Sequence, residues 1–92
     1  MRAEIKYIKT DELIPYALNS RTHSEEQISQ ISASIREFGF TNPILVDDEM
    51  TIIAGHGRLQ AAKRLKMKEV PCIALGHLTE TQKKVLKKFY KN

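Results

Sequence analysis

The chain has few of the residues with which small proteins form stabilising disulfides or structural metal sites. Its 92 residues include one cysteine, Cys72, which excludes an internal disulfide, and three scattered histidines, which form no Cys/His pattern for zinc. No segment approaches the roughly 18 uninterrupted apolar residues of a membrane-spanning helix, and Met1–Lys6 lack the apolar stretch of a secretory signal. We therefore expect a cytoplasmic protein without a membrane partner, and without a metal held by protein ligands alone.

Length and charge limit the domain count and the class of partner. Ninety-two residues allow one domain, since a chain this short buries only roughly 60–65% of its unfolded surface. Residues 1–46 hold 5 basic and 6 acidic side chains, net −1, whereas residues 47–92 hold 10 and 5, net +5. A basic half favours binding of phosphates, although lysines that only keep the chain soluble give the same count. We expect one domain over residues 1–92, in which a basic helix over 79–92 either ends the fold or begins a further region.

The first half predicts a strand and an amphipathic helix. Alternating apolar residues over 3–7 predict a short strand with Ala3, Ile5 and Tyr7 on one face, and residues 10–15 predict one helical turn. Ser24–Gln27 fits a capping box, so the helix is predicted over Glu25–Phe38 with Gly39 as its left-handed end. Its apolar stripe consists of Ile28, Ile31, Ile35 and Phe38.

The second half predicts a hairpin, a glycine turn and two more helices. Apolar runs over 44–46 and 51–54 flank an acidic turn and read as paired strands. A helix is predicted over Arg58–Lys66, a strand over Glu69–Leu75, and a last helix after the capping box Thr79–Gln82, with Val85, Leu86 and Phe89 on its apolar face. The fold class is α+β, with a mixed sheet of short strands and about three helices.

The segment Gly55-His56-Gly57-Arg58 carries the strongest functional signal. Glycines at a strand exit let a ligand approach the backbone, and the following helix directs unpaired N–H groups and its positive dipole end to the same place. A cation in that first turn is disfavoured unless an anion lies nearby. The pattern predicts a phosphate site; a tight turn with a solvated arginine is the alternative. His56 could donate to a phosphate, act as an acid or base, or cap the turn.

The last predicted helix carries a basic strip. The strip consists of Lys83, Lys84, Lys87, Lys88 and Lys91. It is either a solvent-exposed face or a surface that binds a nucleic acid backbone without sequence preference.

Four stretches of the chain carry a resemblance to a known family. In order and spacing, these stretches resemble the ParB N-terminal domain over about residues 8–73: Leu13–Pro15 with Asn19–Arg21, Ser34–Val46, Ile53–Leu65 and Val70–Ile73. The sequence of these stretches looks closest to the phage-type version of the domain, which is found with DNA methyltransferases. The resemblance implies a fold shared with sulfiredoxin and free-serine kinases, in a bacterial or phage-encoded protein.

The resemblance also implies a ligand and partners. A nucleoside triphosphate, CTP or ATP with Mg2+, would place its phosphates on Gly55, His56, Gly57 and Arg58. Neighbouring loops would contribute Arg21, Gly39, Thr41, Asn42 and Pro43. The implied partners are DNA, contacted without sequence preference, a second copy of the chain, and a DNA methyltransferase or partition protein.

This chain departs from the family at the glycine turn. Partition proteins usually have Gly-Glu-Arg-Arg at the positions where this chain has Gly-His-Gly-Arg. The resemblance therefore does not determine which nucleotide base is bound or whether the nucleotide is hydrolysed. Sulfiredoxin has its catalytic cysteine at the position of His56, which disfavours reductase chemistry. An enzyme remains an alternative, as a CTP hydrolase, a small-molecule phosphotransferase or a nuclease, with His56 and Glu25 or Glu26 as catalytic candidates. A third alternative is an interaction domain that dimerises through Phe89.

Overall fold

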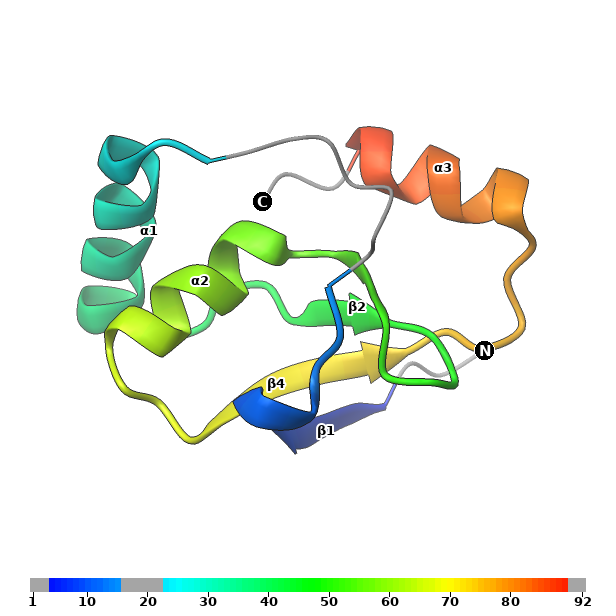
Figure 1. Cartoon of the computed structure of the whole chain (residues 1–92), viewed down its shortest axis with the longest axis horizontal. Coiled ribbons are helices and arrows are strands. Elements are labelled where there is room, and N and C mark those ends of the chain that lie inside the picture. Colours follow the sequence, from blue (N-terminus) through cyan, green and yellow to red (C-terminus); the bar gives the residue numbers. More distant parts are fainter. Residues whose placement is uncertain (1–3, 16–22, 90–92) are drawn as a thin grey trace.

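The computed structural model describes residues 4–15 and 23–89, and within them it confirms the predicted α+β class (Figure 1). No helix in these ranges is long and apolar enough to cross a membrane. The elements follow in the order β1 (Ile5–Lys9), the 3-10 turn η1 (Thr10–Glu12), α1 (Glu25–Phe38), β2 (Ile44–Val46), β3 (Ile52–Ala54), α2 (His56–Arg64), β4 (Glu69–Ala74) and α3 (Glu80–Phe89).

The strands form one mixed sheet in the order β1-β4-β2-β3. β4 lies inside the sheet, antiparallel to β1 and parallel to β2, and β2 pairs with β3 as the predicted antiparallel hairpin. Because β3 leads directly into α2, the hairpin positions the start of that helix at an edge of the sheet.

Different helices cover the two faces of the sheet. Ile44 and Val46 belong to a buried cluster with Leu59 of α2, and α1 packs on α2 through a second cluster. Leu45 points to the opposite face, where Leu86 of α3 packs against its cluster. α3 accordingly lies apart from α1 and α2 (Figure 1).

Helix starts follow the sequence closely. The Ser24 hydroxyl accepts from the Gln27 N–H at 3.1 Å, and the Gln27 side chain accepts from the Ser24 N–H at 3.1 Å, so the predicted capping box and both ends of α1 are confirmed. Thr79 and Gln82 make the same pair at the start of α3. Gly39 has the predicted positive φ, 75°, but its ψ of −171° is extended and not left-handed helical, a combination open essentially only to glycine.

Several predictions about elements were wrong in detail. α2 begins at His56 and not at Arg58. Ile8 is the buried residue of β1, whereas Ile5 and Tyr7 are exposed, and Phe38 and Val85 are exposed on their helices.

The exposure of the β1 face has a physical cause. The register places Ile5 beside Ile73, and Ile73 beside Leu45, so Ile5 and Tyr7 belong to the face that α3 covers. α3 packs at the Leu45 end of that face, however, and does not extend to β1.

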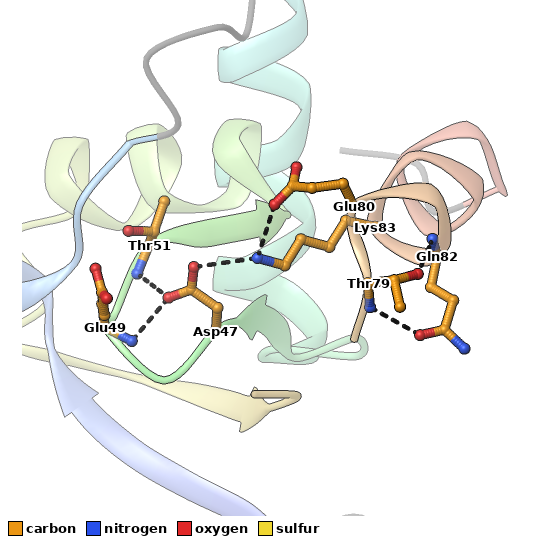
Figure 2. Close-up of polar contacts among 7 residues, drawn as sticks. All are labelled: Asp47, Glu49, Thr51, Thr79, Glu80, Gln82 and Lys83. Carbon is orange, nitrogen blue, oxygen red and sulfur yellow. Dashed lines mark hydrogen bonds and ion pairs between the residues drawn. The ribbon is translucent and has the colours of Figure 1, made fainter. Parts of the chain in front are cut away.

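A carboxylate ties α3 to the β2–β3 turn. Asp47 Oδ1 accepts from the N–H groups of Glu49 at 2.8 Å and Thr51 at 3.0 Å, while Oδ2 lies 3.5 Å from Lys83 Nζ (Figure 2). Lys83 Nζ is also 3.5 Å from Glu80. Desolvation lowers the pKa of the Lys83 ammonium, but the charges of Glu80 and Asp47 outweigh it and raise that pKa above its ordinary value. The Lys83 ammonium therefore stays charged through neutral pH and loses its proton only in strongly alkaline solution.

Replacing Asp47 should separate its turn role from its ionic role. Asp47→Ala removes the acceptor of two turn hydrogen bonds, and we expect the free energy of unfolding to fall by about 1–2 kcal/mol in urea titration. Asp47→Asn keeps a carbonyl oxygen for the turn and loses only the charge, so its loss should be smaller. An Asn variant as unstable as the Ala variant would show that the ionic contact, and not the turn, is the stabilising part.

Candidate functional site

Gly55 forms the joint between β3 and α2. It is the N-cap of α2 in a left-handed conformation, with φ 107° and ψ 22°. A Cβ atom there would lie 3.2 Å from Ile44 Cγ1 and 3.3 Å from Ile44 Cα, so conformation and space both require glycine. Unlike Ser24 and Thr79 on the other two helices, Gly55 has no side chain to cap the first turn. The N–H groups of that turn therefore depend on other acceptors.

Gly57 lets the neighbouring elements approach that first turn. A Cβ atom at this position would lie 2.9 Å from His23 Nε2 and 3.1 Å from Ile31 Cδ1. Gly55 and Gly57 are buried, whereas His56 and Arg58 are only half-buried. A ligand thus reaches the turn from the side of His56 and Arg58.

His23 is a member of the site that local sequence did not identify. The sequence predicts it only as a loop or helix-boundary residue, but its ring lies against Gly57. Its Nδ1 atom is buried and has no hydrogen-bond partner within the described part of the chain. Buried polar atoms are rarely left unpaired, so this nitrogen is an uncommon feature beside the glycine turn.

The Arg58 guanidinium lies beside the loop predicted to accompany it. The surrounding donors and acceptors assign the Asn42 amide so that its oxygen accepts from Arg58 Nη2 at 3.0 Å and its nitrogen donates to the Thr41 carbonyl at 3.1 Å. Arg58, Gly39 and Thr41 line a pocket of about 240 Å3. The structure therefore brings together the glycine turn and the loop at residues 39–42, which are far apart in the sequence.

α1 supplies the far wall of this pocket. Gln30 and Ser34 lie four residues apart on one face of α1 and line the pocket together with Ile31 and Ile35. The sequence marks the two isoleucines as an apolar stripe, but no local pattern shows that the polar pair beside them faces Arg58. The pocket thus combines hydrogen-bonding groups with apolar surface.

The predicted catalytic carboxylates do not gather at His56. Glu25 makes two contacts to Arg64 Nη2, at 2.8 and 2.7 Å, and Arg64 is the last residue of α2. His56 begins that helix, about 12 Å away along its axis. The structure thus engages Glu25 at the end of α2 opposite to His56, and Glu26 lies exposed on the first turn of α1.

The predicted basic strip of α3 is interrupted. Lys83 is turned toward Asp47 and Glu80 and so is not a cation open to phosphates, while Lys84 and Lys88 are exposed. Several predicted residues lie outside what the structure describes: Arg21 and Lys91, and the side chains of Lys87 and Phe89. Within the described residues, no group of three or more His, Cys, Asp or Glu side chains could hold a metal ion.

Cys72 is a core residue of β4. It is fully buried in the cluster beneath α2, and burial raises the pKa of its thiol from 9.0 to about 11. Because the thiolate is the nucleophile, this cysteine is poorly reactive.

Alkylation kinetics would check the state of Cys72. A rise of two pKa units lowers the thiolate fraction about 100-fold at neutral pH, and burial hinders access further. We expect iodoacetamide to modify the native protein at least 100-fold more slowly than the urea-unfolded protein, as followed by mass spectrometry. Comparable rates in the two states would contradict a buried thiol.

Solved structures with the same fold include complexes with nucleotides. The chain superimposes on the C-terminally truncated chromosome-partitioning protein ParB from Caulobacter crescentus complexed with CTP-gamma-S, with a TM-score of 0.79 and 29% identity, covering 94% of this chain and 53% of that one. Sulfiredoxin from Arabidopsis thaliana gives a TM-score of 0.72 at 19% identity, covering 90% and 97%. A free serine kinase in complex with AMP gives 0.70 at 20% identity, covering 87% and 34%. The last two show a shared fold, as predicted.

Sequence relatives point to the same family. The "ParB-like nuclease domain-containing protein YnaK" of Escherichia coli strain K12 is 54% identical over 82 residues, which cover 89% of this chain and 94% of that protein. A probable chromosome-partitioning protein ParB of Rickettsia bellii is 36% identical over 70 residues, 75% of this chain but 24% of that protein. The family model "ParB N-terminal domain" matches residues 1–87. The chain belongs to the ParB N-terminal domain family.

Proposed function

We propose that this chain binds a nucleoside triphosphate through its phosphates at the start of α2, as a module of a DNA-associated system such as partition or phage DNA modification. The observation that carries the proposal is the position of Arg58, which follows a helix start without a capping side chain and lines a pocket with the 39–42 loop. The CTP-gamma-S complex of the Caulobacter crescentus relative supports the ligand class.

Electrostatics favour a phosphate at this position. The positive end of the α2 dipole disfavours Arg58 by about 0.3–1 kcal/mol. The Asn42 amide oxygen accepts from the guanidinium at 3.0 Å and orients it beside the pocket. A phosphate would accept from the guanidinium and from the first-turn N–H groups together, which makes the arrangement favourable.

The pocket suits part of a nucleotide. Its volume of about 240 Å3 lies below the roughly 300–1,000 Å3 of sites that enclose a whole small ligand. Gln30 and Ser34 offer hydrogen bonds, and Ile31 and Ile35 offer apolar contact. We place the phosphates over the glycine turn and a part of the nucleoside against α1.

Magnesium would be held mainly by the nucleotide itself. Mg2+ commonly binds through substrate phosphates and water with few protein carboxylates. The bound cation would neutralise phosphate charge. Turnover is not part of the proposal, because Arg64 holds Glu25 away from His56.

Calorimetry with CTP, ATP, GTP and ADP, each with and without Mg2+, tests the proposal. Arg58→Ala should weaken binding by about 1.5–3 kcal/mol, through loss of charged hydrogen bonds. Arg64→Ala is the matched control, since it removes an arginine from the other end of the same helix and should leave affinity unchanged.

Two results would end the proposal. One is the absence of heat for every nucleotide at millimolar concentration with the unmodified chain. The other is an equal loss of affinity in the Arg58 and Arg64 variants, which would point to a general charge effect.

A further inference from the structure

A second basic hollow lies at the opposite end of α2. It has a volume of about 930 Å3 and lies between β1 with η1 and the loop from α2 to β4. Its lining includes Tyr7, Lys9, Lys63, Lys66 and Lys68 and shares no residue with the Arg58 pocket. We refer to these five residues and the space between them as the lysine groove.

The loop that carries the lysines is fixed to the body of the fold. Thr10 is buried, its N–H donates to the Lys68 carbonyl at 3.0 Å, and its hydroxyl donates to the Met67 carbonyl at 3.2 Å. The Met67 N–H donates to the Ala62 carbonyl at 2.9 Å, and the Met67 side chain packs against the core. Lys66 and Lys68 therefore project from a rigid frame.

The lysines of the groove are not used to hold the fold together. Lys9, Lys63, Lys66 and Lys68 are exposed, and none of them makes an ion pair within residues 4–15 and 23–89. The lining includes two acidic residues as well, so positive charge prevails by four to two. Lys66 also has a positive φ of 60°, an uncommon conformation for a residue with a side chain.

Tyr7 also lines the groove, from the face of the sheet opposite to α2. Tyr7 is 68% exposed, and it shares a strand face with Lys9 because the two are two residues apart on β1. A positively charged groove with an exposed ring is the combination that binds single-stranded nucleic acid, in which cations follow the backbone and bases stack on aromatic faces.

We propose that the lysine groove binds single-stranded nucleic acid, with the four lysines on backbone phosphates and the Tyr7 ring against a base. An acidic protein segment would match the lysines but would give no role to the exposed ring. The proposal rests on the DNA association given above and not on nucleotide binding at Arg58.

Fluorescence anisotropy with a labelled single-stranded oligonucleotide and with its duplex tests this assignment. Lys66→Gln with Lys68→Gln should weaken single-strand binding at least tenfold and lower the salt slope by about 1.4, since each phosphate contact contributes about 0.7. Tyr7→Ala should weaken single-strand binding about fivefold or more with little effect on the duplex. Lys84→Gln with Lys88→Gln, an equal loss of charge from exposed positions on α3, should change affinity less than twofold.

Several results would overturn the proposal. One is that neither oligonucleotide binds at low salt. Others are an equal loss of affinity in the α3 control variant and an unchanged affinity in the Tyr7 variant. Competition by polyglutamate as strong as competition by unlabelled oligonucleotide would indicate an acidic protein partner instead. Urea midpoints matching the unmodified chain would verify folding of each variant. Lys66→Gln with Lys68→Gln should leave nucleotide affinity in the calorimetric titrations unchanged, so failure of the nucleotide proposal would be seen separately.

Discussion

The passage from β3 into α2 through a single residue is the constraint on which the candidate site depends. Gly55 has a φ of 107°, and a Cβ atom there would lie 3.2 Å from Ile44, so the chain can turn so tightly only without a side chain. The same requirement removes the usual helix cap, because a glycine N-cap offers no acceptor. The first-turn N–H groups that follow Gly55, beside Arg58, are therefore the place at which we propose phosphate binding.

Local rules in the sequence predict most of the helical framework. Ser24 with Gln27 and Thr79 with Gln82 form capping boxes whose hydrogen bonds involve only neighbouring residues, so they can be recognised without tertiary information. The start of α2 was placed two residues late because glycine has a low helix propensity. In the first turn, however, N–H groups need no intrahelical acceptor, and Gly57 is favoured there by the close approach of His23.

The rest of the site depends on packing between distant segments. The packing of α1 on α2 brings three side chains to the turn: His23, Gln30 and Ser34. No spacing in the sequence predicts where the two helices meet. Exposure is hard to predict for a related reason. Periodicity identifies which face of a strand or helix is apolar, but not how far a neighbouring element covers that face. Tyr7 and Phe38 both belong to apolar faces, and both side chains are exposed.

The positive charge of the second half of the chain is divided among three roles. Arg64 and Lys83 hold elements together through Glu25 and Asp47, and a cation used in this way has less capacity for phosphate. Arg58 lines the pocket beside the 39–42 loop. Lys63, Lys66 and Lys68 line the lysine groove. Net charge alone cannot separate these roles, since every one of these side chains counts equally in it.

The dipole of α2 distinguishes the two surfaces at which we propose anion binding. At its first turn, backbone N–H groups point toward the place where the proposal puts one compact phosphate. At its last turn, Lys63 is stabilised by the negative end of the dipole and needs no ligand for its charge to be favourable. A lysine groove that is stable as it stands provides a broad positive field suited to a polymer, so one helix can serve a small nucleotide at its start and an extended polyanion at its end.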